Sequence, residues 1–383
     1  MIATCIGALS LAVWLYLFAA RGRFWRVSTV EAGLKAQAPA PRIAVVIPAR
    51  NEADVILPVI RSLLGQDYAG PLRIFVVDDH SSDQTAAIVR DVETDHSDRL
   101  SLVRSDPLPA GWTGKMWALS QGTQSAAEFS PDYFLFTDAD IIHAGDSIST
   151  LVSLAQSDDL DLVSMMAKLR CSSFAERALI PAFVYFFFML YPPKWVNNPT
   201  DNTAAAAGGD ILVRTGALER IGGIAAIRHE LIDDCALARE IKRKGKIRLG
   251  LTNQVMSIRE YGTFASIGRM ISRNAFYQLR HWVWLLLGTL VAMAVTFIAP
   301  PILIFFSSWA RLLGGLAWLI MTITFLPMVT FYSVSPIWAP LLPLIGMFYT
   351  GATVHSAVQY WLGRGGEWKN RKQDAKKKTV SSS

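Results

Sequence analysis

The chain has 383 residues, of which 52% are hydrophobic and 18% charged, so it is too apolar to form two soluble domains of ordinary composition. Part of it is therefore expected to lie in a lipid bilayer. The apolar content excludes an intrinsically disordered protein, and only three cysteines, far apart in the sequence, exclude a disulfide-stapled scaffold. Such cysteines fit buried thiols in a reducing compartment.

The net charge of +6 arises from basic residues that flank apolar segments. Arginines gather at residues 21–26, a second basic group lies between residues 259 and 280, and a third lies in the tail after residue 363. Clusters of this kind mark membrane-helix ends that face the cytoplasm and anionic headgroups. We therefore expect a membrane partner and no nucleic acid.

The first expected element is a transmembrane helix over residues 1–20. This segment has no charged residue and as a helix would be about 30 Å long, which matches the hydrocarbon core of a bilayer. The arginines follow the segment and none precedes it, which favours a retained anchor over a cleaved signal peptide. The positive-inside rule then places the N-terminus outside and the following chain in the cytoplasm.

Residues 37–258 are expected to form a cytosolic α/β domain. Short strand-like runs recur along it, at residues 43–48, 73–77, 100–104, 133–137 and 161–167. Because helix-length segments separate the first four runs, we expect a doubly wound, mostly parallel sheet with right-handed crossovers. Ligands of such a sheet bind beyond the carboxyl ends of its strands.

Three of these strands are followed by acidic residues. Glu52 follows the first, Asp79 the second, and Asp138 and Asp140 the fourth. Carboxylates gathered at one sheet edge repel each other unless a cation is bound, and the Asp-x-Asp spacing suits Mg²⁺ or Mn²⁺ completed by substrate phosphates. The predicted ligand is a nucleoside diphosphate with its metal, although a plain polar turn is the alternative. His143 is either a third metal ligand or a local hydrogen-bonding group.

A phosphate-binding loop of a common type is absent from the sequence, because it has neither Gly-x-Gly-x-x-Gly after the first strand nor Gly-x-x-x-x-Gly-Lys-Ser/Thr anywhere. This argues against a dinucleotide dehydrogenase and a P-loop NTPase. The segment Gly-Trp-Thr-Gly-Lys at residues 111–115, at an expected helix start, offers backbone N–H groups and the ammonium of Lys115 to a diphosphate. A solvated first-turn lysine is the alternative.

The remaining apolar segments are expected at the membrane. Residues 178–193 are too few to span comfortably, so they form either an interfacial helix or a buried one, whereas residues 263–281 are expected to form an amphipathic interfacial helix. Residues 282–362 are long enough for three transmembrane helices with a turn near 333–336. Four crossings in total would put the basic tail, residues 363–383, outside, so one apolar run is expected to be interfacial or re-entrant.

The motifs resemble those of a known family. VVIPARNE at residues 45–52, VVDDHSSD at 76–83 and DAD at 138–140 are similar to the three leading motifs of family 2 glycosyltransferases, in the same order. Together with the segments at 111–118, 208–210 and 278–280, the sequence looks most like the hopene-associated glycosyltransferases. The resemblance implies a GT-A fold and an enzyme that inverts the anomeric carbon of a nucleotide sugar, usually a UDP-sugar.

The resemblance also implies roles for individual residues. Pro48, Arg50, Glu52 and Asp79 would line the nucleoside, Asp138 would approach ribose and metal, and Asp140 would bind the metal. Further substrate contacts would come from Gly209, Asp210, Gln278 and Arg280.

The base would be Asp234 of the Asp233-Asp234 pair. Inversion requires one carboxylate to take the acceptor proton while the metal stabilises charge on the leaving diphosphate, so base and metal belong on different segments. The alternative for this pair is that it only complements a helix dipole.

These features predict a multi-pass enzyme of the bacterial inner membrane that moves a sugar to a lipid acceptor at the cytoplasmic face, and the resemblance suggests a hopanoid as this acceptor. A processive polysaccharide synthase is a weaker alternative, because its Gln-x-x-Arg-Trp motif is changed to have His281 at the arginine position. A noncatalytic membrane scaffold that keeps a nucleotide-binding fold is the third alternative.

Overall fold

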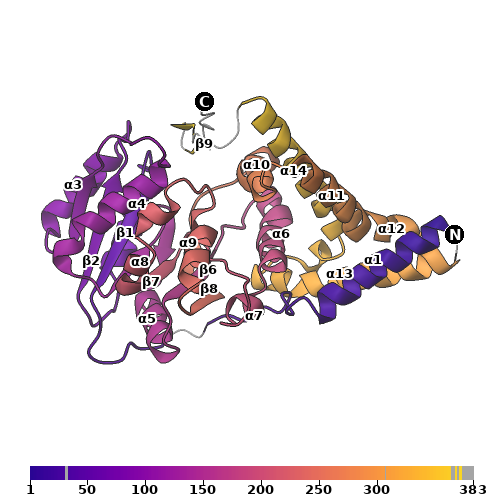
Figure 1. Cartoon of the computed structure of the whole chain (residues 1–383), viewed down its shortest axis with the longest axis horizontal. Helices are drawn as coiled ribbons and strands as arrows, with labels where there is room; N and C mark the ends of the chain where they lie inside the picture. Colours follow the sequence, from indigo (N-terminus) through magenta and orange to yellow (C-terminus); the bar gives the residue numbers. More distant parts are fainter. Residues whose placement is uncertain (31–32, 307, 364–366, 369–370, 373–383) are drawn as a thin grey trace, which may run out of the picture. The chain divides into compact units, whose positions relative to one another are not determined.

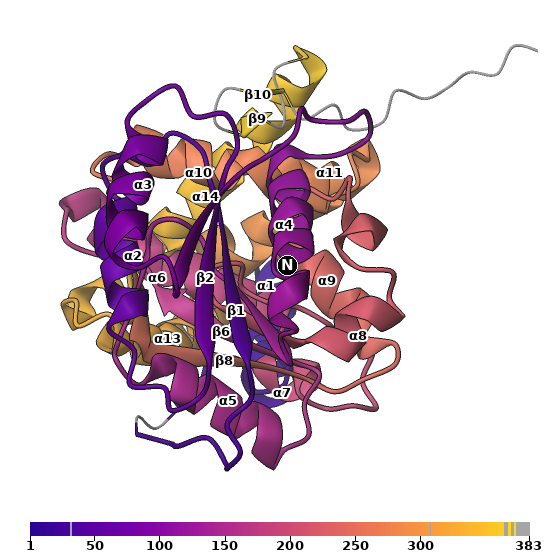
Figure 2. The same cartoon turned by 90° about the vertical axis from the view of Figure 1, so that its left-hand side faces the viewer.

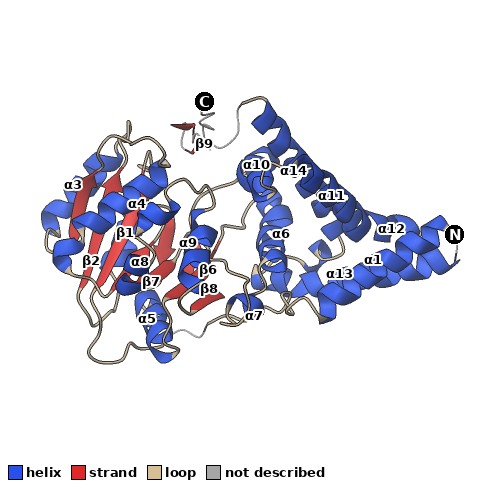
Figure 3. Cartoon of the chain, viewed as in Figure 1, coloured by secondary structure: helices blue, strands red, loops and turns tan. Residues whose placement is uncertain are grey.

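The computed structural model describes residues 1–30, 33–306, 308–363, 367–368 and 371–372. The chain divides into two compact units (Figures 1 and 3). The described residues of the helical unit are 1–27, 170–195, 260–306 and 308–363, and those of the sheet unit are 28–30, 33–169, 196–259, 367–368 and 371–372. Residues 170–195 therefore leave the expected α/β domain and join the helices. Most of the basic tail lies outside the described residues.

The sheet unit is built on an eight-stranded mixed sheet in the order β3-β2-β1-β4-β7-β6-β8-β5. Its strands are β1 (Ile43–Ala49), β2 (Leu72–Asp78), β3 (Leu100–Arg104), β4 (Tyr133–Phe136), β5 (Ile141–His143), β6 (Leu162–Lys168), β7 (Ile211–Arg214) and β8 (Ile247–Ser257). The first four in spatial order run parallel, and β7 and β5 join their neighbours antiparallel. The expected GT-A-like sheet is confirmed, and so are the five expected strands.

Helices cover both faces of this sheet, with α2 and α3 on one side and α4 and α9 on the other (Figure 2). The helices of the unit are α2 (Ile56–Leu64), α3 (Thr85–Asp95), α4 (Gly114–Ser125), α5 (Ser147–Ser157), α8 (Thr215–Arg220) and α9 (Asp233–Lys242), with the short 3-10 helices η1 (Ala127–Phe129) and η2 (Ile224–Ile227). A main core forms between β1 and the buried faces of α2 and α5.

Helix α4 packs unusually close to the strands because Gly122 has no side chain. A Cβ atom there would lie 2.3 Å from Val46 Cγ1 and 2.9 Å from Val77 Cγ2. A close helix–sheet approach of this kind requires glycine. It fixes α4 against β1 and β2, so the first turn of α4 is held at the carboxyl edge of the sheet.

The helical unit consists of long apolar helices. They are α1 (Ile2–Ala19), α6 (Phe174–Leu190), α10 (Phe264–Gln278), α11 (Val283–Met293), the π-helical turn η3 (Ala294–Ile298), α12 (Ala299–Leu303), α13 (Ser308–Phe331), η4 (Pro336–Trp338) and α14 (Leu342–Trp361), while the short α7 (Pro193–Val196) follows α6. Beyond these, β9 (Glu367–Trp368) pairs antiparallel with β10 (Arg371–Lys372).

Four helices in the described part of the chain are long and apolar enough to cross a membrane: Ile2–Ala19, Phe174–Val196, Val283–Leu303 and Ser308–Phe331. Only two of the three spans expected after residue 281 are among them. The third segment forms α14, in which His355 and Gln359 lower the hydropathy. The expected turn between α13 and α14 and the expected helix over 263–281 are both present.

Candidate active site

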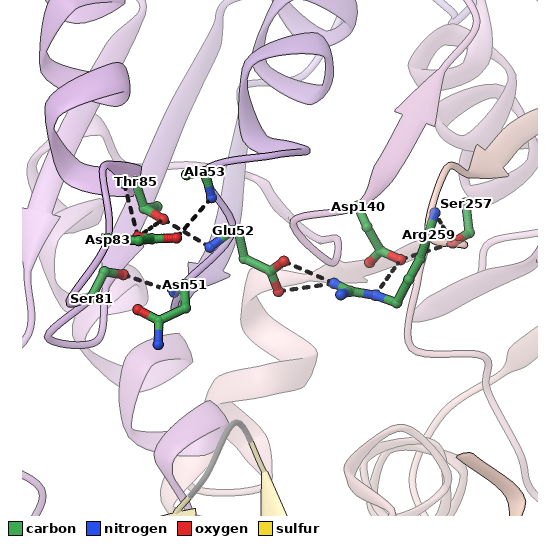
Figure 4. A network of polar contacts seen from close by, with 9 residues as sticks. All are labelled: Asn51, Glu52, Ala53, Ser81, Asp83, Thr85, Asp140, Ser257 and Arg259. Atoms are coloured by element: carbon green, nitrogen blue, oxygen red, sulfur yellow. Dashed lines mark hydrogen bonds and ion pairs between the residues drawn. The ribbon is translucent and has the colours of Figure 1, made fainter. Parts of the chain in front are cut away.

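The acidic residues after β1, β2 and β4 lie at one edge of the sheet, because these three strands are parallel neighbours. The two loops after β1 and β2 hold each other in place. The amide of Asn51 donates to Ser81 Oγ at 3.0 Å, and the amide of Glu52 donates to Thr85 Oγ1 at 2.8 Å (Figure 4). Asp83 accepts from the amide of Thr85, the first residue of α3, at 3.0 Å and from the amide of Ala53 at 3.1 Å, so it also ties the two loops together.

The predicted nucleoside residues Arg50 and Asp79 also come together. Arg50 Nη1 lies 3.6 Å from Asp79 Oδ2 and donates to the backbone carbonyl of Asp79. The Asp79 side chain is buried, so the guanidinium compensates a carboxylate that is removed from water. Pro48, a further predicted nucleoside residue, lies on β1, is buried, and lines a cavity at the same edge of the sheet.

Lys115 lies at the centre of the site and joins two acidic segments. Thr113 is the N-cap of α4, so Lys115 belongs to its first turn. Its ammonium is 2.9 Å from Asp138 Oδ1, after β4, and 3.1 Å from Asp233 Oδ2, at the start of α9. Burial alone would lower the pKa of Lys115, but the adjacent Asp138 and Asp233 raise the pKa above its ordinary value. The lysine is therefore a permanent cation.

Asp234 lies beside this bridge and is held by backbone donors. Its Oδ2 accepts from the amide of Gly208 at 2.9 Å, and its Oδ1 accepts from the amide of Cys235 at 2.7 Å. Burial and the neighbouring Asp233 raise its pKa to about 6, while Lys115 acts in the opposite direction. A carboxylate with this pKa is ionised at neutral pH and is basic enough to accept a proton.

A small cavity opens onto these charged groups. Its charged lining comes from Lys115, Asp138, Asp233 and Asp234, and Gly208 forms part of its wall. The rest of the wall is apolar and includes side chains from α4, η2 and α9. Charged groups of opposite sign in a mostly apolar pocket interact strongly, which is the arrangement expected of a reaction site.

Asp140 is paired with a residue that the sequence analysis placed only among the basic membrane flanks. Its Oδ2 accepts from Ser257 Oγ at 2.8 Å and from Arg259 Nε at 3.1 Å. Arg259 Nη2 also donates to both carboxylate oxygens of Glu52, each at 2.9 Å (Figure 4). The sequence signal for Arg259 is an arginine shortly after the end of a strand at the acidic edge. This signal can be read only once β8 is known to be a strand, and β8 was not predicted from the sequence.

His143 lies inside the domain and its ring faces two hydroxyls. Its Nε2 is 3.0 Å from Thr137 Oγ1, and its Nδ1 is 3.5 Å from Ser147 Oγ. Burial lowers its pKa to about 3, so the ring is neutral. Thr137 Oγ1 also donates to the carbonyl of Gly209 at 2.8 Å, which ties β4 to the predicted substrate segment.

The other predicted substrate-binding residues are placed differently. Asp210 is fully buried, neither of its carboxylate oxygens has a hydrogen-bond partner among the described residues, and burial raises its pKa well above the usual value. Gln278 and Arg280 belong to the helical unit, where the Gln278 amide donates to the Tyr191 hydroxyl. Their part in substrate binding stays a prediction.

The carboxylates fit a divalent ion only as a site that substrate completes. No group of three or more His, Cys, Asp or Glu side chains in the described residues is arranged to hold a metal. Asp138 and Asp140 supply the one or two protein carboxylates that Mg²⁺ takes together with substrate phosphates. Both are already paired with protein cations, Lys115 and Arg259. The positive charge that the sequence analysis expected from a metal is therefore partly supplied by the chain itself.

Comparison with known proteins identifies the domain. Residues 44–232 match the family described as Glycosyl transferase family 2. The match supports a family 2 glycosyltransferase domain over this part of the chain. It is similar to an N-acetylglucosaminyltransferase of Rhizobium leguminosarum bv. viciae, 36% identical over 114 residues, which are 30% of this chain and 25% of that protein. It is also similar to the probable glycosyltransferase YdaM of Bacillus subtilis strain 168, 29% identical over 189 residues, or 48% of this chain and 43% of that one.

These matches span less than half the length of the curated relatives. Among solved structures, the mannosyltransferase PcManGT from Pyrobaculum calidifontis, in complex with GDP-Man and Mn²⁺, superposes with a TM-score of 0.55. It is 19% identical, and the superposition covers 92% of this chain and 98% of that one. At this identity the likeness supports the fold alone, and the GT-A fold of the glycosyltransferase domain is confirmed.

Proposed function

We propose that this protein is a membrane-bound inverting glycosyltransferase. It moves one sugar from a nucleotide sugar, a UDP-sugar by preference, to a lipid acceptor of the hopanoid class at the cytoplasmic face of the bacterial inner membrane. The observation that carries the proposal is Lys115, which joins Asp138 and Asp233 beside the basic carboxylate of Asp234, at the ligand-binding edge of a family 2 domain.

The donor is proposed to bind with its diphosphate near Lys115. The start of α4 offers backbone N–H groups and the ammonium, both of which favour anionic oxygens. Arg50, Glu52 and Asp79 would face the nucleoside from the loops after β1 and β2. Two curated relatives are named N-acetylglucosaminyltransferases and a solved neighbour binds GDP-Man, which supports a nucleotide-sugar donor and leaves the sugar to experiment.

Asp234 is proposed to be the catalytic base. An acceptor hydroxyl placed in the cavity would donate its proton to Asp234 as its oxygen attacks the anomeric carbon from the face opposite the diphosphate. The hydrogen bonds from Gly208 and Cys235 fix the carboxylate, so it needs no reorientation during the reaction. Lys115 keeps Asp233 charge-compensated next to it, which prevents the pKa of Asp234 from rising further.

Asp138 and Asp140 would hold a Mg²⁺ or Mn²⁺ ion that arrives with the donor. His143 is left out of the proposed metal site, because its ring nitrogens contact the hydroxyls of Thr137 and Ser147. When bound, such an ion neutralises charge on the leaving diphosphate. Lys115 would contribute to the same task from beside Asp138, because its ammonium persists at any physiological pH.

The helical unit is proposed to hold the enzyme against the leaflet in which the acceptor dissolves. Three crossings satisfy the charges: α1, the continuous segment of α11 to α12, and α13. Gly7 of α1 packs beside Leu303 and Leu313, so the turn between α12 and α13 lies near the outer end of α1. Helix α6 begins and ends within a few residues of the sheet unit, so it cannot carry the chain across, and α14 is too polar. This count leaves the basic tail inside.

The test is a transfer assay with the purified full-length protein. Labelled UDP-glucose, UDP-N-acetylglucosamine and GDP-mannose are incubated separately with a hopanoid-containing bacterial lipid extract, and labelled lipids are identified by mass spectrometry and their anomeric configuration by NMR. Asp234→Asn should reduce transfer by about 10²- to 10⁴-fold. Asp158→Asn is the matched control, because Asp158 forms a peripheral ion pair with Arg248, and it should leave transfer unchanged.

Transfer to a lipid with inversion, lost in Asp234→Asn alone, supports the proposal. Transfer that continues unchanged in Asp234→Asn would remove the base. A protein that binds nucleotide sugars without transferring or hydrolysing any of them would instead be the noncatalytic scaffold.

A further inference from the structure

Arg259 connects two sides of the donor site that come from different strands. It follows β8, which pairs with β5 so that Ile141 lies opposite Ser257. This pairing brings Arg259 beside Asp140, while its guanidinium reaches Glu52 in the loop after β1 (Figure 4). One cation thus bridges a predicted nucleoside contact and a predicted metal ligand.

The bridge is well made and partly shielded from water. Both carboxylate oxygens of Glu52 accept from the same nitrogen, Arg259 Nη2, and Asp140 accepts one hydrogen bond from Arg259 and one from Ser257. The side chains of Glu52 and Asp140 are only 8% and 12% exposed, and that of Arg259 is 30% exposed. Without Arg259 the two carboxylates would lose the positive charge that they share, which is costly in a partly buried site.

The same geometry opposes a divalent ion. An ion bound to the Asp140 carboxylate would lie about 2.1 Å from its oxygen and therefore within about 6 Å of the guanidinium. A double and a single positive charge at that separation repel by enough to weaken binding about tenfold, even in a nearly aqueous dielectric. Asp140 therefore cannot serve both cations well at once.

We propose that Arg259 is a positioning residue that occupies Asp140 in the nucleotide-free enzyme and gives it up to the divalent ion when the donor binds. The inference rests on the proposed function. The diphosphate supplies the negative charge that makes the exchange favourable, because it completes the metal shell while Arg259 keeps its bond to Glu52. Metal loading is thereby made dependent on the nucleotide, so the free enzyme does not fill its site with metal alone.

The experiment measures Mn²⁺ binding by electron paramagnetic resonance, using the full-length protein in detergent with and without UDP or GDP. Wild type should bind Mn²⁺ weakly alone and much more tightly with the nucleotide. Arg259→Gln should raise the affinity for Mn²⁺ alone by about tenfold and shrink the effect of the nucleotide. Arg259→Lys keeps the charge and should remain within about threefold of wild type. Arg248→Gln, within β8 and paired with Asp158, is the matched control and should change nothing.

Equal Mn²⁺ affinities in wild type, Arg259→Gln and Arg248→Gln would overturn the inference while leaving the transferase proposal intact. If no form of the protein binds Mn²⁺ even with UDP or GDP, the metal part of the proposed function fails and this inference fails with it. Should Arg259→Gln not fold, the wild-type structure with Mn²⁺ and nucleoside diphosphate decides. The inference requires the contact between Arg259 Nε and Asp140 to be broken there, and an intact contact beside bound Mn²⁺ contradicts it.

Discussion

Replacement of Lys115 by methionine should shift the pH dependence of transfer toward higher pH. Methionine keeps most of the length of the side chain and removes the ammonium that lies 2.9 Å from Asp138 and 3.1 Å from Asp233. Asp234 would then face Asp233 without the cation that now lowers its pKa of about 6. A base must be ionised to act, so activity should fall away at a higher pH than in wild type.

The size of the shift follows from the distance between the two groups. Asp234 Oδ2 and Lys115 Nζ each lie 3.4 Å from the point that a Cβ atom on Gly208 would occupy, so they are within about 7 Å of each other. A pair of unit charges at that separation interacts by about 0.6 kcal/mol in water and about 2.4 kcal/mol at an effective dielectric of 20. This corresponds to roughly 0.4 to 1.7 pKa units, so the acidic limb should move from about 6 to about 7.

The assay is the pH dependence of kcat/KM between pH 5 and 9, with the donor found by the transfer experiment. Lys115→Arg, which keeps the charge, should retain the wild-type limb even if its rate is lower. Lys246→Met removes a more exposed lysine of the same domain and should alter neither rate nor profile. An acidic limb that stays at the wild-type pH in Lys115→Met would refute the coupling between Lys115 and the base.

Three further predictions concern stability. Asp210→Asn removes a buried carboxyl whose pKa is raised by burial, so its contribution to stability is complete below about pH 4 and is lost as the pH rises. In chemical unfolding the variant should therefore be more stable than wild type by about 1 to 3 kcal/mol at pH 8, and this difference should vanish toward pH 4. Gly122→Ala should lower the melting temperature, because the added methyl group overlaps Val46 and overpacking costs about 1 to 3 kcal/mol. Glu176→Ala should destabilise the helical unit by about 2 kcal/mol in the same unfolding assay, because the Glu176 carboxylate accepts hydrogen bonds from backbone N–H groups at the start of α6 and from that of Tyr261. Glu219 is exposed, so Glu219→Ala should leave the stability unchanged. A wild-type-like result for Glu176→Ala, or a Gly122→Ala protein as stable as wild type, would contradict the packing described here.

The parallel half of the sheet was predictable from sequence, because each of its strands is a short apolar run bounded by turns and separated by a helix. Strands β5, β7 and β8 were missed for identifiable reasons. Strands β5 and β7 have only three and four residues, and the regular alternation of β8 breaks at Leu251 and Thr252, which are both buried. Since β8 carries Arg259 to the acidic edge, missing the strand also meant missing the residue.

The candidate site was predictable in its parts and not in its pairings. The carboxylates after β1, β2 and β4 converge as parallel strands require, and Lys115 lies in the first turn of α4 as its sequence context indicated. The partners of these groups depend on contacts distant in the sequence, such as Lys115 with Asp233 and Arg259 with Glu52. No local sequence pattern encodes those contacts. Because the partners Lys115 and Arg259 were unknown, the negative charge of the carboxylates at the sheet edge was expected to be balanced by a metal alone.

The membrane segments illustrate a similar limit. Apolar length predicted α1 and α13 directly, but residues 178–193 were expected to be too few to span, whereas α6 and α7 together form a segment, Phe174–Val196, that is long and apolar enough to be a candidate span. Both ends of this segment lead into the sheet unit, so whether it crosses depends on where the chain goes before and after it and not on its length.

The account depends most on the claim that the carboxyl edge of the sheet binds a nucleoside diphosphate together with a divalent ion. Isothermal titration of UDP, GDP, ADP and dTDP into the wild-type protein and Asp138→Asn, with and without Mn²⁺, tests it most directly. The account predicts that one of the nucleotides binds wild type tightly only when Mn²⁺ is present, and that Asp138→Asn loses this binding. Absence of binding by all four nucleotides, or binding that is indifferent to both Mn²⁺ and Asp138, would contradict it.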